Sequence, residues 1–256
     1  MTHIKWMLGM FSKNAQGFER YAHSGISCIA FFLVSALFFL AMPEIDLSIS
    51  NYFYDGLGYF PLNENLLVKI VYQGIPWLGR LIFLIALIVV LTAVIAPSSF
   101  SRRHWRRAAS MVAVVVLGVG FLVHTVLKDG MGRPRPRDVQ TFAGSTTFVP
   151  VFTPSHFCAT NCSFVSGHAA VGFSLMSLGM LGVRRRRNFW FLTGLFAGSL
   201  IGFVRIAQGG HFLSDVIFSF VAIWAVHLLV RSVWVRFRTW QLFLSSDRAA
   251  RLNAIQ

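Results

Sequence analysis

Residues 77–107 read WLGRLIFLIALIVVLTAVIAPSSFSRRHWRR, an apolar run of membrane-spanning length that ends in a cluster of arginines. A helix needs about 20 apolar residues to cross the hydrocarbon core of a bilayer. Because the hydrophobicity is continuous rather than alternating, the pattern predicts helices and not a transmembrane barrel. The same pattern recurs along the chain, so we expect an all-α integral membrane protein with six transmembrane helices. We place these helices at residues 24–43, 77–96, 109–127, 167–183, 189–207 and 213–233.

The composition agrees with a membrane protein. Of the 256 residues, 55% are hydrophobic and 12% are charged, and the mean hydropathy is +0.64. A soluble domain carries about twice that charged fraction. The formal net charge is +14, which would also fit a nucleic-acid-binding protein. The basic residues, however, fall in short clusters between apolar runs, so membrane topology explains them better than nucleic acid does.

These basic clusters predict the orientation. Six crossings put residues 1–23, the arginines after the second helix, Arg184–Arg187 and residues 234–256 on one side of the membrane. By the positive-inside rule that side is cytoplasmic. The six-helix domain would span residues 24–233 and expose its two long loops on the non-cytoplasmic side. These loops cover residues 44–76, where aromatic residues suggest interfacial helices, and residues 128–166.

The second long loop begins with basic residues on the side where they are disfavoured. Lys128 ends the third helix, and Arg133 and Arg135 follow within Gly- and Pro-rich turns. Arginine offers a planar fork to phosphate oxygens, and lysine offers a mobile point charge. We interpret the group as a phosphate site; a snorkelling helix end is the alternative for Lys128.

Ser166-Gly167-His168 opens the predicted fourth helix. The N-terminus of a helix presents free N–H groups and a partial positive charge to an anion. Ser166 also suits a helix N-cap, and His168 alone would fit a hydrogen-bonded interfacial histidine. These three residues therefore indicate a phosphate site only when they are considered together with the other motifs.

Arg205, His211 and Asp215 form the third group. His211 and Asp215 are four residues apart, so they share one helix face. A carboxylate that accepts from one imidazole nitrogen leaves the other nitrogen as a nucleophilic lone pair. A structural salt link is the alternative. Pairing would also explain why an aspartate is tolerated in a membrane segment.

Taken together, Lys128-x6-Arg135-Pro136, Ser166-Gly167-His168 and Arg205-x5-His211-x3-Asp215 resemble the type 2 phosphatidic acid phosphatase (PAP2) superfamily, which includes vanadium haloperoxidases. The resemblance covers most of residues 24–233. Val165 and Val204 depart from the Pro and Ser that the family often has at these positions.

The resemblance implies a phosphatase mechanism with eight site residues. Lys128, Arg135, Arg205, Ser166 and the Gly167 amide would bind phosphate oxygens. His211 would attack phosphorus and form a phosphohistidine, Asp215 would orient it, and His168 would protonate the leaving oxygen and then activate water. No cofactor or metal is implied, and three nearby cations would repel a divalent ion.

The implied enzyme is a phosphoric monoester hydrolase in a bacterial inner membrane, with its active site facing the periplasm. The stretch 161–168, with Cys158 upstream, resembles the bacterial lipid A phosphatases, especially the 4′-type, as does 46–55. Phosphatidic acid, phosphatidylglycerophosphate or undecaprenyl pyrophosphate is the alternative substrate. A vanadate haloperoxidase and a non-catalytic lipid carrier are the alternative classes. The six predicted spans argue against the haloperoxidase. The complete set of His168, His211 and Asp215 argues against the carrier. The two cysteines of C-x3-C, Cys158 and Cys162, could form a disulfide outside the cytoplasm.

Overall fold

The computed structural model describes residues 23–253, with side chains as far as Gln241. The predicted cytoplasmic segment 1–23 therefore lies, except for His23, outside the described residues. Within the described range there is no strand, only an isolated bridge between Val139 and Thr146. The elements are a first helix (His23–Ala41), α2 (Glu44–Asn51), η1 (Pro61–Asn63), α3 (Leu66–Ile95), α4 (Ser99–Val114), η2 (Val115–Lys128), α5 (Asp129–Met131), η3 (Pro136–Asp138), η4 (Gln140–Phe142), α6 (Gly167–Ser174), η5 (Leu175–Gly179), α7 (Arg184–Ala207) and α8 (Leu213–Asn253).

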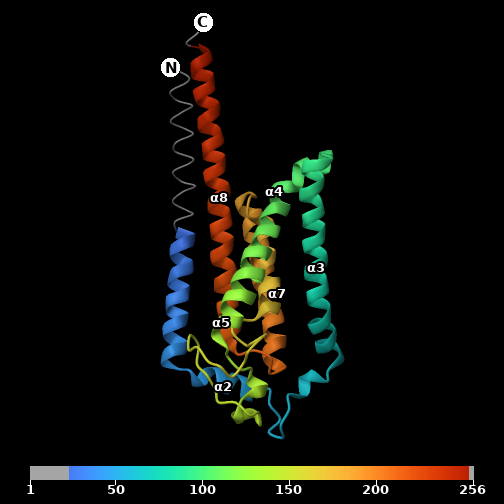
Figure 1. Cartoon of the computed structure of the whole chain (residues 1–256), viewed down its shortest axis with the longest axis vertical. Coiled ribbons are helices and arrows are strands. Elements are labelled where there is room, and N and C mark those ends of the chain that lie inside the picture. Colours follow the sequence, from blue (N-terminus) through green and yellow to red (C-terminus); the bar gives the residue numbers. More distant parts are fainter. Residues whose placement is uncertain (1–22, 254–256) are drawn as a thin grey trace.

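The long helices run roughly along one axis, so the described chain has two ends (Figure 1). α2 and the loops between α5 and α6 gather at the lower end of the view, where η2 finishes and α8 begins. The starts of α4 and α7 lie at the upper end, and α8 extends beyond them. The motif residues therefore belong to one end of the bundle and the arginine clusters to the other.

Five described helices are long and apolar enough to cross a membrane: His23–Ala41, Leu66–Ile95, Ser99–Asp138, Arg184–Ala207 and Leu213–Gln241. The all-α membrane fold is confirmed. The count of six is not, because the predicted span 167–183 is an 8-residue α6 followed by a 5-residue 3-10 helix.

This short segment is buried inside the bundle instead of facing lipid. Ala169, Ala170 and Phe173 are at most 1% exposed. Gly198 of α7 lies so close that a Cβ there would collide with the Phe173 ring. Small residues at such interfaces let neighbouring helices approach closely. A segment enclosed by other helices needs neither the length nor the continuous α-geometry of a lipid-facing span.

The helices also extend beyond their predicted apolar runs. α3 begins at Leu66, so the first long loop is shorter than 44–76, and Trp77 lies within the helix. α4 begins at Ser99 with a capping box, so its arginines lie on a helix and not in a loop. Arg184–Arg187 likewise form the first turn of α7, and α8 continues into the predicted tail as far as Asn253. Arginine stems can cover apolar surface while their charged heads reach water, so a helix can continue past the hydrocarbon.

Cys158 and Cys162 are joined by a disulfide in the loop that precedes α6. The disulfide that the C-x3-C spacing suggested is therefore present in the structure. It closes a turn next to Asn161 and Ser163, two residues that contact the motif side chains described below.

Candidate active site

The structure places the three predicted motifs at the lower end of the bundle. Lys128 ends η2, Ser166 caps α6, Arg205 lies in the last turn of α7, and Asp215 lies in the first turn of α8. These four residues are at most 3% exposed. Lys128, Arg135 and Arg205 lie close enough to His168 for their charges to act on its ring. The chain thus brings the predicted residues together from five separate segments.

The His211 ring is held in one orientation by a main-chain carbonyl. Its Nδ1 atom lies 2.8 Å from the oxygen of Ser163. A carbonyl oxygen can only accept, so Nδ1 carries the proton and Nε2 carries the lone pair. Burial lowers the pKa of His211 to about 3, although the nearby Asp215 carboxylate acts in the opposite direction. The ring is consequently a neutral imidazole at neutral pH.

Asp215 acts on this ring less directly than its spacing suggested. Its Oδ2 lies 3.6 Å from Nδ1 of His211, whereas the main-chain oxygen of Ser163 lies 2.8 Å from Nδ1 and accepts the hydrogen bond. The same carboxylate accepts from the Ser163 hydroxyl at 2.5 Å and from the Phe212 main-chain N–H at 2.8 Å. Asp215 therefore fixes the loop residue that holds the ring and adds its negative charge close to Nδ1.

Arg133, which the sequence grouped with Lys128 and Arg135 as a phosphate ligand, instead forms a buried charge network with Asp215 and with Asp46, a residue that was not predicted to belong to the site. Arg133 donates to Asp215 Oδ1 at 2.7 Å and to Asp46 Oδ2 at 2.8 Å, and it is 1% exposed. Asp46 also accepts from the main-chain N–H and the hydroxyl of Ser214. The guanidinium lies 4.3 Å from the ring centre of Phe212. A buried arginine with two carboxylate partners is a structural cation, unlike the other predicted phosphate ligands.

Lys128, Arg135 and Arg205 are held by neutral acceptors instead. Asn161 accepts from Lys128 through its side-chain oxygen at 2.7 Å and from Arg135 through its main-chain oxygen at 2.7 Å. Gln208 accepts from Arg205 at 2.5 Å. Neutral acceptors orient these cations without cancelling their charge. Asn161 and Gln208 were not predicted; their signal was only that they neighbour the motifs.

Two buried site atoms lack a hydrogen-bond partner among the described residues: Nε2 of His168 and Nε of Arg205. Buried polar atoms are ordinarily paired, so such atoms point to a ligand. Tyr72 of α3 packs against both residues. Its ring stacks on the ring of His168, with the ring centres 5.1 Å apart, and its ring centre lies 4.4 Å from Cζ of Arg205. Tyr72 is thus a further site residue that the sequence did not indicate.

The remaining predicted phosphate ligands lie at the start of α6. The Ser166 side chain caps this helix by accepting from the Ala169 N–H at 3.5 Å, and its main-chain N–H donates to the carbonyl of Asp215. A Cβ at Gly167 would lie 2.9 Å from the ring of His124, so only glycine fits without displacing that histidine. Ser166 thereby links the α6 N-terminus to the His211–Asp215 segment.

Glycines shape the turn between α7 and His211. Gly209 has a φ of +63°, a conformation that side chains other than glycine rarely adopt. A Cβ at Gly210 would collide with the Arg205 guanidinium. The turn therefore allows Arg205 and His211 to share a single buried site.

Comparison with known proteins places this site in a family. The PAP2 superfamily pattern matches residues 107–239. A lipid A 4′-phosphatase of Francisella tularensis subsp. novicida is 33% identical over 207 residues, which is 76% of this chain and 90% of that protein. One from Rhizobium leguminosarum is 28% identical over 72% of this chain and 84% of its own length. A phosphatidylglycerophosphatase B of Bacillus subtilis is 28% identical over 59% of this chain and 67% of its own length. No solved structure matches.

The chain belongs to the PAP2 superfamily, as its motifs indicated. It is a bacterial membrane lipid phosphatase, a phosphoric monoester hydrolase, and it resembles the lipid A 4′-phosphatases.

The charge network leads to a prediction for Arg133. Arg133→Gln leaves Asp46 and Asp215 buried without their cation, so we expect kcat to fall by on the order of 10²-fold or more while KM changes little. Arg133→Lys, which keeps the charge but loses the fork, should retain more activity. Steady-state kinetics on purified protein measure both effects.

The neighbouring Arg137 provides the matched control. Its side chain is about half exposed, so Arg137→Gln removes the same charge without disturbing the buried network. Full kcat in a folded Arg133→Gln protein would show that Arg133 does not position Asp215.

Proposed function

We propose that the enzyme transfers the phosphoryl group of a lipid to Nε2 of His211 and then to water. The observation that carries this proposal is the hydrogen bond from His211 Nδ1 to the Ser163 carbonyl. It leaves a neutral imidazole with its Nε2 lone pair in a site that contains Lys128, Arg135 and Arg205. A nucleophile, a fixed tautomer and surrounding cations are the parts that stepwise phosphoryl transfer requires.

In the first step Nε2 bonds to phosphorus and the bond from phosphorus to the lipid oxygen breaks. The phosphoryl oxygens are held by the side chains of Lys128, Arg135, Arg205 and Ser166 and by the main-chain amide of Gly167. Burial and the neighbouring cations lower the pKa of His168 to about 4 in the free site, so the proton that His168 donates to the leaving oxygen enters with the substrate phosphate, whose negative charge favours the protonated ring. The His211 ring then carries a positive charge, which the Ser163 carbonyl and the Asp215 carboxylate stabilise.

In the second step His168, now neutral, accepts a proton from water. The oxygen of that water attacks phosphorus, the phosphorus–nitrogen bond breaks and Nε2 regains its lone pair. The unpaired Nε2 atom of His168 supports both roles, because this atom is available to a substrate oxygen or a water.

This mechanism predicts different defects for the two histidines. His211→Ala should abolish turnover. His168→Ala should lose least with an aryl phosphate, whose leaving oxygen needs no proton, and most with an alkyl phosphate lipid. Phosphate release from detergent-solubilised protein measures both, and it also separates a phosphatase from a non-catalytic lipid carrier.

His156→Ala is a suitable control, because His156 is an exposed loop histidine. Normal turnover by His211→Ala would exclude His211 as the nucleophile. An equal loss for aryl and alkyl substrates in His168→Ala would exclude His168 as the general acid.

For the substrate we propose lipid A, with loss of one phosphate. The names of two relatives support this choice, as do the stretches 161–168 and 46–55. A lipid can keep its acyl chains in the bilayer while its phosphate enters the site, and each buried CH₂ contributes about 0.8 kcal/mol. Soluble phosphomonoesters should therefore show much lower kcat/KM. The Bacillus subtilis relative makes a glycerophospholipid phosphate the second candidate.

Mass spectra of lipid A from cells that express the chain should show loss of one phosphate, and cells that express His211→Ala should not. Unchanged lipid A together with rapid cleavage of phosphatidylglycerophosphate, phosphatidic acid or undecaprenyl pyrophosphate would reject lipid A. That result would leave the phosphohistidine mechanism intact.

We further propose an inner-membrane location with the active-site end facing the periplasm. The arginines at the other end support this orientation by the positive-inside rule. In a variant without native cysteines, a cysteine at exposed Ser145 should react with a membrane-impermeant thiol reagent in whole cells. A cysteine at exposed Asn188 should react only after lysis, and its labelling in intact cells would reverse the topology.

A further inference from the structure

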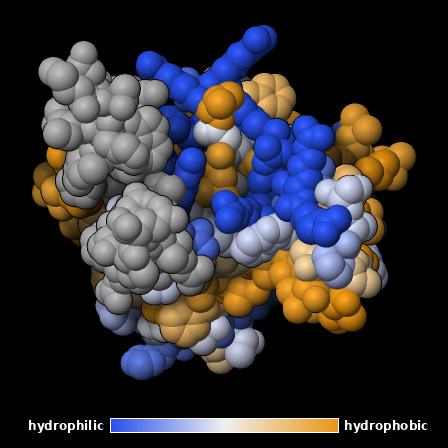
Figure 2. Space-filling model, turned by 90° about the horizontal axis from the view of Figure 1, so that it is seen from above, coloured by the Kyte–Doolittle hydropathy of each residue, from blue (hydrophilic) through white to orange (hydrophobic). Residues whose placement is uncertain are grey.

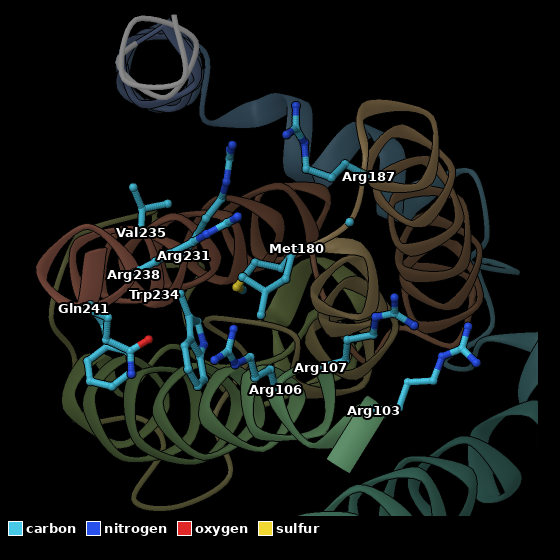
Figure 3. A pocket seen from close by; sticks show the side chains of 13 residues that line it. Arg103, Arg106, Arg107, Met180, Arg187, Arg231, Trp234, Val235, Arg238 and Gln241 are labelled. Carbon is cyan, nitrogen blue, oxygen red and sulfur yellow. The ribbon is translucent and has the colours of Figure 1, made fainter. Parts of the chain in front are cut away.

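Arginines from three helices surround a cavity of about 370 Å³ at the end of the bundle opposite the active site (Figure 3). We call it the basic cavity. Its arginines belong to α4, α7 and α8, and they are Arg103, Arg106, Arg107, Arg187, Arg231 and Arg238. The volume lies within the roughly 300–1,000 Å³ that is typical of small-molecule sites. None of the residues that line the cavity takes part in the proposed mechanism.

The charge of the basic cavity is one-sided. Among the described residues that line it, none is an aspartate or a glutamate. Arg103 and Arg186 lie close enough to Arg107 for their positive charges to repel its guanidinium, and an anion bound there removes that repulsion. Arginine forks also match phosphate oxygens geometrically. Seen from above, hydrophilic side chains gather on this end of the molecule (Figure 2).

Aromatic residues fix part of this cationic surface. Trp105 of α4 packs against Trp234 of α8, which lines the cavity, with ring centres 5.6 Å apart. The Arg106 guanidinium lies 5.5 Å from the ring centre of Trp105. Arg106 is thus held beside the cavity wall by its own helix, which reduces the ordering that ligand binding would require.

Membrane topology alone does not explain this convergence. The positive-inside rule requires only that positive charge lies on one side of the membrane, not that arginines converge on one cavity. Arg102 and Arg185 contribute positive charge on the same side without lining the cavity. Met180 and Leu181 give the cavity an apolar part, and the exposed Val235 and Phe237 lie at its edge. Polar donors beside exposed apolar side chains suit an amphipathic phosphate.

We propose that the basic cavity is a second phosphate-binding site, whose ligand is the headgroup of an anionic phospholipid or a free phosphate. Basic pockets between helices at a membrane surface commonly bind anionic headgroups. Arg106 and Arg107 are the central ligands, because adjacent positions on α4 present two forks to one cavity. The site is separate from catalysis, so it stands or falls independently of the phosphohistidine mechanism.

Native mass spectrometry of the full-length protein tests this site by titration with phosphatidylglycerol and with phosphatidylcholine. Arg106→Gln/Arg107→Gln should weaken phosphatidylglycerol binding by on the order of tenfold. Arg102→Gln/Arg185→Gln removes the same charge outside the cavity and should bind like the unmodified protein. Arg106→Lys/Arg107→Lys should retain most of the binding. Unchanged phosphatase activity in all three variants shows that they are folded.

Inorganic phosphate, added as a competitor, identifies the source of the ligand. Displacement of phosphatidylglycerol at millimolar phosphate would show that the phosphate group alone suffices. Retention of the lipid would show that the headgroup and its chains are required. Equal loss of affinity in both glutamine double variants, or equal binding of phosphatidylcholine and phosphatidylglycerol, would overturn the proposal.

Discussion

The guanidinium of Arg133 lies between the carboxylates of Asp46 and Asp215, and all three side chains are at most 2% exposed. Each charge alone would be costly inside an apolar bundle, and together they satisfy one another. Asp46 lies on α2 and Asp215 on α8, so the network connects α2 to the first turn of α8, next to His211. Removing one partner of such a buried pair typically costs about 3–5 kcal/mol, enough to displace the groups that Asp215 holds.

The cations of the site are of two kinds, which differ in whether their partners are carboxylates or neutral groups. Arg133 is neutralised by carboxylates and serves the structure, whereas Lys128, Arg135 and Arg205 are oriented by Asn161 and Gln208 and keep their charge. A phosphate that enters therefore meets uncompensated positive charge. At the same time the ring of His211 is held by a neutral carbonyl, with the Asp215 carboxylate behind it. The arrangement favours both a neutral nucleophile before the reaction and a cationic ring after it.

The membrane fold could be predicted from the sequence because it depends on local pattern, namely apolar runs of fixed length. The eight motif residues were named from their fixed spacing and from the family resemblance; the structure brings them together, and their catalytic roles stay a prediction. Without the resemblance, the residues alone could not separate Arg133 from Arg135, which are two residues apart in the same loop. That distinction depends on Asp46, 87 residues away in the chain. Likewise, residues 167–183 read like a span although α6 and η5 within them are buried in the bundle, because an apolar composition does not distinguish lipid from neighbouring helices. Tyr72 lies in a stretch predicted to be a loop, so nothing local indicated its contact with His168.

The position of the phosphoryl group on His211 tests the central claim most directly. The carbonyl of Ser163 occupies the Nδ1 side of the ring, so only Nε2 can be the nucleophile. Rapid quenching of the enzyme with ³²P-labelled lipid, alkaline digestion and separation of the two phosphohistidine isomers would identify the modified nitrogen. The account predicts phosphate on Nε2 of His211 and none in His211→Ala. Phosphate on Nδ1, or on another residue, would contradict it.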